Sequence, residues 1–194
     1  EGLIEKMFAL VDVKVPRPFP RMSYDTAMEM YGSDKPHLGF DLAWKRMNLP
    51  AGAEEKLHIM QPFKALRVPG WATASRSQLD KLQEQAKSSG ADWFAYAKVD
   101  ESGAHSPLAK GIGEDAVRTL ISGVDAKAGD LVLFLGLKSA KADRAAISKL
   151  DNASGDLRLE IGRRLELIKP GTWSFLWVID FPMFEYDDKE KRYG

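Results

Sequence analysis

The run DLVLFLGL at residues 130–137 restricts the fold more than any other stretch of this chain. A strand with one solvent face alternates apolar and polar side chains, whereas an uninterrupted apolar run of this length is typical of a strand covered on both faces. We therefore predict a buried central strand at 130–137. The rest of the chain must supply the elements that cover it.

Two further segments are predicted to be strands. FKALRV at 63–68 alternates and ends at a proline–glycine turn. DWFAYAKV at 92–99 also alternates, with its first aromatic residue and two alanines on one face. Residues 41–63 carry a weaker pattern, which we interpret as a short helix over 42–47 and a loop at 50–53.

Helices are expected between and after these strands. Ser75 or Ser77 is predicted to cap a helix that closes at Gly90, and a short helix is expected over 114–121. A long helix is predicted over 139–167, kinked or split at its central glycine, Gly155. This order of elements predicts an α+β fold, a mixed or antiparallel sheet with helices packed on it.

The two ends of the chain are less self-contained. Residues 2–12 have near-helical apolar spacing, and after three prolines a second helix is expected from Ser23 until Gly32 stops it. The run SFLWVIDFPMF at 174–184 is predicted to be a second buried strand, and the charged tail after it a turn or hairpin tip. A lone helix and a lone apolar strand need partners, which indicates an inserted unit between two flanks.

Composition excludes several functional classes. The 194 residues are 44% apolar and carry 28 basic and 28 acidic side chains, so the net charge is zero and a strong sequence-independent grip on nucleic acid is not expected. Without cysteine there is no disulfide framework and no cysteine-built zinc site. We expect no membrane span, because no apolar run approaches about 20 residues. Residues 1–11 have no basic region and no initiating methionine, so we expect a chain cut from a longer protein or beginning internally.

The most suggestive polar cluster is SDKP at positions 33–36. Ser33, Asp34 and Lys35 are candidates for positioning a charged ligand close to a substrate. The competing interpretation is an ordinary turn, in which Asp34 caps local backbone and Pro36 stiffens the chain. From the residue types alone, the turn is favoured.

A second candidate is the basic face of the long predicted helix. Arg158, Arg163 and Arg164 are candidates for contacting an RNA backbone. Acidic residues at 156, 160 and 166 surround them, so ordinary pairing between residues four apart is the competing interpretation.

No catalytic or metal-binding residue is assigned. The three histidines lack metal-ligand spacing, and acidic residues at 114 and 115 would repel a phosphate from the helix that starts there. The acidic tail residues alternate with lysine and arginine, which favours a solvated turn over a metal cluster. The three histidines are His37, His58 and His105, and the acidic residues at the helix start are Glu114 and Asp115. The acidic residues of the tail are Glu185, Asp187, Asp188 and Glu190.

Several motifs resemble a known family in its own order. FPRMSYDTAMEMYGSDKPHLGF at 19–40, with YGSDKP as its specific core, resembles the segment after the second class II motif of bacterial aspartyl-tRNA synthetases. ALRVPGWATASRSQLDKL at 65–82, followed by DWFAYAKV, SPLAK, GDLVLFLG and LRLEIGRRLELI, resembles their inserted GAD domain, which tRNA-dependent amidotransferase subunits share. FLWVIDFPMFE at 175–185 is similar to the strand that re-enters the catalytic sheet.

The resemblance implies three parts: a catalytic-domain flank at 1–40, a GAD-like insertion at 41–172 and a second flank at 173–194. The chain departs from the family at His37, where an acidic residue is usual, and at 41–63, which is shorter than the family's stretch.

The resemblance also implies an activity for the parent protein. Such ligases activate L-aspartate with ATP and Mg²⁺ and transfer it to tRNA, act as homodimers, and are cytoplasmic. Their catalytic arginines lie in the second and third class II motifs, which no stretch here matches, so this segment is expected to be inactive alone and to bind no cofactor. Two alternatives remain open: a GAD-type tRNA-contacting module of an amidotransferase, and a purely structural insertion.

Overall fold

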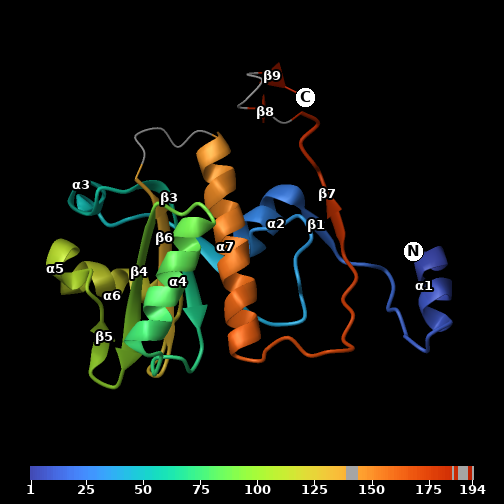
Figure 1. The fold of residues 1–194 in the computed structure, drawn as a ribbon, viewed down its shortest axis with the longest axis horizontal. Coiled ribbons are helices and arrows are strands. Elements are labelled where there is room, and N and C mark those ends of the chain that lie inside the picture. Colours follow the sequence, from blue (N-terminus) through green and yellow to red (C-terminus); the bar gives the residue numbers. More distant parts are fainter. Residues whose placement is uncertain (139–143, 185, 188–191, 194) are drawn as a thin grey trace.

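The computed structural model describes residues 1–138, 144–184, 186–187 and 192–193. Its main body is a five-stranded sheet of order β2-β3-β6-β4-β5, in which every neighbouring pair is antiparallel (Figure 1). The expected α+β architecture with an antiparallel sheet is therefore confirmed. The strands are β2 (Trp44–Met47), β3 (Met60–Val68), β4 (Trp93–Asp100), β5 (Gly103–His105) and β6 (Leu131–Leu137).

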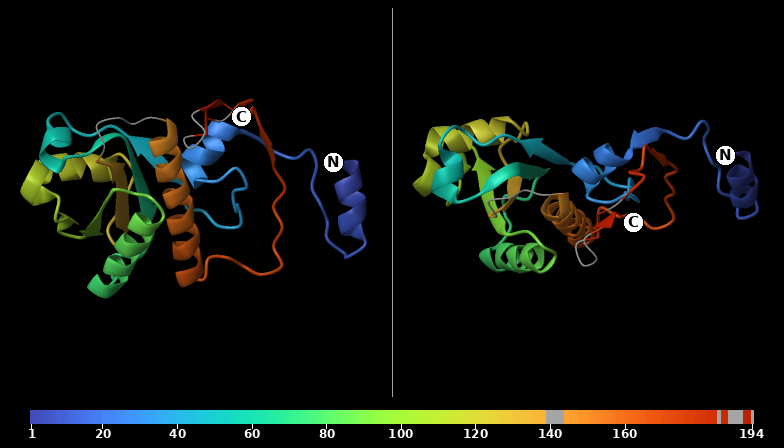
Figure 2. Two further views of the ribbon diagram at one scale, coloured as in Figure 1. Left: turned by 45° about the horizontal axis from the view of Figure 1, so that its top comes forward. Right: turned by 90° about the horizontal axis from the view of Figure 1, so that it is seen from above.

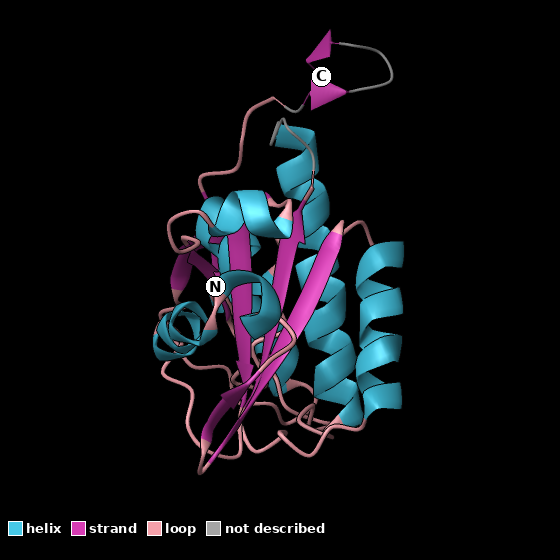
Figure 3. Cartoon of the chain, turned by 90° about the vertical axis from the view of Figure 1, so that its left-hand side faces the viewer, coloured by secondary structure: helices cyan, strands magenta, loops and turns pink. Residues whose placement is uncertain are grey.

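The apolar run at 131–137 is the central strand of this sheet, and all of its residues are buried. Alternate side chains enter two separate cores. Leu131, Leu133 and Leu135 face the long helices α4 (Arg76–Ser88) and α7 (Arg144–Arg164). Val132 and Phe134 face the short helices α5 (Ala109–Ile112) and α6 (Glu114–Ser122). Figure 3 shows the two long helices together on one face of the sheet.

Local signals account for how α4 and α6 begin. Ser75 is the N-cap of α4, and its side chain and that of Gln78 form a reciprocal capping box, so Ser75 rather than Ser77 starts the helix. The predicted helix at 114–121 is confirmed as α6, which follows Gly113 directly.

Asp130 closes the turn before the central strand. Its carboxylate accepts hydrogen bonds from the backbone amides of Gly70 at 3.0 Å and Lys127 at 2.9 Å, and from Arg67 Nε at 2.6 Å. Burial alone would raise the pKa of Asp130, but these three donors hold it below its ordinary value. The carboxylate thereby ties the ends of β3 and β6 to one turn.

The two ends of the chain pair with each other. The short strands β1 (Arg21–Ser23) and β7 (Trp177–Ile179) form a separate parallel sheet, in which Met22 lies opposite Val178. Helix α2 (Tyr24–Tyr31) follows β1 and packs against α7. Helix α1 (Gly2–Ala9) lies at the far end of the molecule from the five-stranded sheet (Figures 1 and 2).

An aromatic cluster joins these ends. The ring centroid of Phe8 lies 5.0 Å from that of Trp173 and 4.8 Å from that of Phe175, and Phe19 stacks on Phe175 at 5.4 Å. The Glu1 carboxylate accepts a hydrogen bond from the indole of Trp177 at 2.9 Å. Residues from both ends of the sequence therefore share one small apolar contact region.

The large exposed apolar side chains of the described residues all lie in these two ends. Leu10 is 86% exposed and Met183 is 85% exposed, whereas the central strand β6 of the main sheet buries all of its apolar residues. The others are Leu3, Met7, Val11, Trp173, Trp177, Phe181 and Phe184.

Three sequence-based predictions were wrong. The predicted helix at 42–47 is the edge strand β2, because Trp44 is buried on the sheet while pairing with β3 fixes the backbone. The apolar run at 174–184 forms only the short strand β7, and no residue of β7 is fully buried. The described part of the long helix, from residue 144, continues unbroken through Gly155, while 139–143 lie outside the described residues.

Four short elements had no counterpart in the prediction: the strands β1 and β5 and the helices α5 and α3 (Ala53–Leu57). The tail strands β8 (Tyr186–Asp187) and β9 (Arg192–Tyr193) pair antiparallel with each other. Among the helices of the described residues, none has the length and apolar character that crossing a bilayer requires.

Candidate functional site

An open cavity of about 650 Å³ lies where α2, the turn after it, α7 and the segment beyond β7 meet. The three residues that the sequence singled out, Ser33, Asp34 and Lys35, all line it. It also receives residues from the flanks and from α7, including Tyr24, Tyr31, His37, Asn152, Arg158 and Phe181.

The Ser33–Lys35 turn carries its own polar contacts. The Lys35 ammonium lies 2.7 Å from the Asp34 carboxylate, and the backbone amide of Lys35 donates to Ser33 Oγ at 3.1 Å. The Lys35 side chain is 84% exposed, so this ion pair contributes at most about 1 kcal/mol. Both the substrate-side interpretation and the turn interpretation are compatible with these contacts.

The position of the turn is set by a close approach of two backbones. Helix α2 ends at Gly32, which has a left-handed φ of +66°. A Cβ atom on Gly32 would lie 2.2 Å from the carbonyl oxygen of Asp151 and 2.3 Å from the amide nitrogen of Gly155. Likewise, a Cβ on Gly155 would lie 2.5 Å from the carbonyl oxygen of Gly32. The two glycines let the end of α2 rest directly on α7, which explains a glycine inside an unbroken helix.

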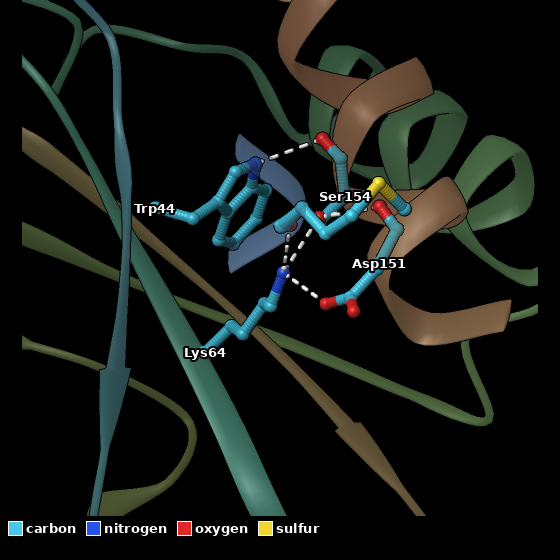
Figure 4. A network of polar contacts seen from close by, with 5 residues as sticks. Trp44, Lys64, Asp151 and Ser154 are labelled. Atoms are coloured by element: carbon cyan, nitrogen blue, oxygen red, sulfur yellow. Dashed lines mark hydrogen bonds and ion pairs between the residues drawn. The ribbon is translucent and has the colours of Figure 1, made fainter. Parts of the chain in front are cut away.

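A buried polar network lies beneath this contact (Figure 4). Lys64 of β3 is fully buried, and its ammonium lies 2.5 Å from the Asp151 carboxylate. The ammonium also donates to Ser154 Oγ at 3.1 Å and to the carbonyl oxygen of Met28 at 3.2 Å. The indole of Trp44 donates to the carbonyl oxygen of Ser154 at 2.8 Å. One lysine thus ties the sheet to both α2 and α7.

Burial shifts both titrating groups of this network toward their neutral forms. It lowers the pKa of the Lys64 ammonium and raises the pKa of the Asp151 carboxyl, and their mutual attraction offsets part of each shift. A signal for Lys64 was present in the sequence. Lys64 has the same strand parity as Leu66 and Val68, so it faces the same core as they do.

The three candidate arginines do not form one face. Arg158 is only 1% exposed, and its guanidinium donates to backbone carbonyl oxygens, so the expectation that it contacts RNA is corrected. Arg164 Nε donates to the Glu160 carboxylate at 2.6 Å, which is the pairing four residues apart that was the competing interpretation. The side chain of Arg163 is 66% exposed and lies 4.0 Å from the same carboxylate.

Two further polar clusters of the described residues show no reactive arrangement. Ser102, His105 and Asp100 lie together on the exposed β4–β5 turn, but both partners contact the same ring nitrogen of His105, so no relay of the serine-protease type exists. The His37 ring accepts a hydrogen bond from the Gly39 amide and packs against Phe40. Across the described stretches, no three His, Asp or Glu side chains converge as a metal site requires. Tail residues 185 and 188–190 lie outside those stretches.

Comparison with known proteins adds a family to this geometry. Residues 55–146 match the model of the GAD domain. The middle of this chain is therefore similar to GAD domains. The match covers the strands β3, β4, β5 and β6 of the main sheet and the beginning of α7. Helix α7 carries Gly155 and Arg158 further along.

The whole chain also matches a segment of the aspartate–tRNA ligase family. It is 40% identical over 196 residues to an aspartate–tRNA(Asp/Asn) ligase of Nitratidesulfovibrio vulgaris. That alignment covers 100% of this chain and 31% of the relative. It is 39% identical over 202 residues to an aspartate–tRNA ligase of Xanthomonas campestris pv. campestris, covering 100% of this chain and 33% of that protein. The chain therefore spans about a third of the length of these relatives.

Proposed function

We propose that this chain is the part of an aspartate–tRNA ligase in which a GAD domain interrupts the catalytic domain. Residues 1–40 and 173–194 are then two catalytic flanks, and 41–172 is the insertion. The observation that carries this proposal is the parallel pairing of β1 with β7, which joins Met22 to Val178 across the whole insertion. The aromatic cluster between the same two ends supports it, as does the similarity of the entire chain to such ligases.

The parent activity follows from this assignment. An aspartate carboxylate oxygen attacks the α-phosphorus of ATP and releases pyrophosphate, and a ribose hydroxyl of tRNA then displaces AMP from the adenylate. When bound, Mg²⁺ neutralises phosphate charge in the first step. We assign no residue of this chain to Mg²⁺ or to catalysis, because no stretch of it resembles the second or third class II motif.

The segment instead supports the reaction by position. Ser33, Asp34 and Lys35 lie on the rim of the cavity between α2 and α7 and are proposed to be close to the substrates. The substrates of the parent are L-aspartate, ATP and tRNA. The parent is proposed to act as a cytoplasmic homodimer.

The first test compares the full-length ligase with the 194-residue chain. The full-length protein is expected to catalyse aspartate-dependent ATP–pyrophosphate exchange, and the chain alone is expected to show none above background. Exchange by the chain alone would show that the chemistry lies within it. A full-length protein without aspartate-dependent exchange would end the ligase proposal.

Of the two remaining arginines, Arg163 is the stronger candidate for RNA contact, because its side chain faces solvent. The side chain of Arg164 is bound to Glu160. In the full-length ligase, Arg163→Ala is expected to raise KM for tRNA about threefold and to lower the salt slope of tRNA binding by about one. Aspartate-dependent ATP–pyrophosphate exchange serves as the internal reference, since it requires no tRNA.

The matched control is Arg76→Ala, because Arg76 is also a helical arginine, lies on α4, and is 91% exposed. The control is expected to leave KM for tRNA unchanged. Equal behaviour of the two variants would favour the purely structural interpretation of the insertion.

A further inference from the structure

Arg158 holds together a loop that has little regular structure of its own. Its Nη2 donates to the carbonyl oxygens of His37 at 3.0 Å and Phe40 at 3.1 Å, and its Nε donates to that of Leu42. These acceptors lie between α2 and β2, outside any helix or strand. Buried carbonyl groups in such a segment need donors, and here one side chain of α7 supplies them.

The same guanidinium contacts two aromatic rings. Its carbon atom is 4.0 Å from the ring centroid of Phe40 and 4.8 Å from that of Tyr31. Desolvation lowers the pKa of Arg158 to about 10, so the group is still charged at neutral pH. Burying this charge is costly, and a leucine or methionine could fill the volume without that cost. The hydrogen bonds to three carbonyl oxygens and the two aromatic contacts offset this cost.

Helix α7 consequently contacts the chain both before and after the Ser33–Lys35 turn. Before the turn, Gly32 rests on Gly155. After the turn, the 37–42 loop is bound by Arg158, which lies on the same face of α7, three residues further along. The intervening turn spans two points that are both fixed by one helix.

We propose that Arg158 is a positioning residue through which helix α7 of the insertion sets the geometry of the Ser33–Lys35 turn. This inference rests on the proposed function, which places that turn beside the substrates. It assigns the insertion a direct effect on the rate of aspartate activation, separate from any contact with tRNA. Arg158 acts through the loop, because its Nε and Nη2 donate to the carbonyl oxygens of that loop.

The test uses Arg158→Lys in the full-length ligase. A lysine keeps the charge but concentrates its donors at one nitrogen, so it does not span three separated carbonyl groups. We expect hydrogen exchange of the backbone amides at 33–42 to become about tenfold faster while the sheet is unchanged. We also expect kcat for ATP–pyrophosphate exchange to fall about tenfold, with KM for aspartate and ATP within about twofold of the wild type.

Two further variants keep the test decisive. Arg76→Lys changes an exposed arginine of the neighbouring helix α4 in the same way and is expected to alter neither readout. Phe40→Leu removes the aromatic ring that packs on the guanidinium while leaving the carbonyl acceptors in place. It is expected to reproduce the Arg158→Lys pattern at smaller size, and it carries the test if Arg158→Lys does not fold.

The outcomes separate this inference from the proposed function. Unchanged exchange at 33–42 would show that Arg158 does not hold the loop. Faster exchange there with normal kcat would show that the loop does not matter for activation, and faster exchange throughout the sheet would reduce Arg158 to a general packing role. Each of these results overturns the proposal. A wild-type enzyme without activity would refute the ligase assignment, while the exchange data would still decide whether Arg158 anchors the loop.

Discussion

Gly32→Ala is expected to lower the free energy of unfolding by about 4 kcal/mol, the sum of two costs. The first is the left-handed φ of +66°, which a Cβ disfavours. The second is steric overlap, because the new atom would lie 2.2 Å from the Asp151 carbonyl oxygen. The neighbours are backbone atoms of α7, so neither can turn aside as a flexible side chain would. Urea unfolding of the 194-residue chain, followed by tryptophan fluorescence, measures this change.

Gly52→Ala is the matched control for the backbone cost. Gly52 has a φ of +74°, and a Cβ there would meet no atom within 4 Å. The control is expected to lose only about 1 kcal/mol. The difference between the two variants then measures the contact of α2 with α7. Equal losses would mean that α2 does not rest on α7 as the structure places it.

Gly155→Ala probes the same contact from the other side. Within a helix, alanine is intrinsically favoured over glycine by about 1 kcal/mol, so the substitution would stabilise an exposed site. Here a loss of about 3 kcal/mol is expected, because the Cβ would lie 2.5 Å from the Gly32 carbonyl oxygen. Gly111→Ala in α5 is the reference, since its nearest neighbour would be at an ordinary 3.5 Å.

These glycines mark how far the sequence could predict the fold. A glycine after a helical pattern predicts a stop, and Gly32 is such a stop. A glycine within a helical pattern predicts weakness, yet Gly155 lies in an unbroken helix. The reason for its presence is a neighbour more than 100 residues away in the chain, which no local pattern contains.

The strand predictions were also correct where the pattern is local and wrong where a distant partner decides the conformation. The strand at 131–137 is covered on both faces, so its sequence is an uninterrupted apolar run that predicts a buried strand. The segment at 44–47 contains good helix formers, and its conformation is decided by pairing with β3. The run at 174–184 has the composition of a buried strand, but among the described strands β7 pairs only with β1, and none of the run's apolar residues is fully buried.

The candidate site was predictable in part. The Ser33–Lys35 turn stood out as a polar cluster in a recognisable motif, and it lies on the cavity. Arg158 was also singled out, but helical spacing places it beside Arg163 and Arg164 only approximately. Spacing does not reveal that its guanidinium turns inward to the 37–42 loop. The role of an arginine depends on acceptors that only the folded chain brings near.

Lys64→Met is expected to cost about 3–5 kcal/mol at pH 7, because it leaves the Asp151 carboxylate buried without its cation. The methionine fills a similar volume, so loss of packing is a minor part of this cost. Asp151 Oδ1 meets the lysine ammonium at 2.5 Å as an ion pair, and it accepts no regular hydrogen bond from any other described group. Without Lys64, the attraction of Arg46, a weaker effect than that of Lys64, is what still opposes desolvation of the carboxylate.

The pH dependence of this loss has a defined sign. Burial already raises the pKa of Asp151 above its ordinary 3.8, and removing the ammonium raises it further. Between 3.8 and the raised folded value, the folded variant holds a proton that the unfolded chain releases, so stability falls as pH rises through that window. The deficit of Lys64→Met relative to wild type is therefore expected to be smaller at pH 5 than at pH 8.

Two further variants test whether the loss of stability comes from the unpaired charge of Asp151. Lys98→Met removes a half-buried lysine of β4 whose ammonium donates to the Ala74 carbonyl oxygen, so its cost should not vary between pH 5 and pH 8. The double variant Lys64→Met with Asp151→Leu removes both charges and is expected to recover most of the lost stability. If the double variant is as unstable as the single one, the network's hydrogen bonds to Met28 and Ser154, rather than its charges, hold α2 and α7 to the sheet.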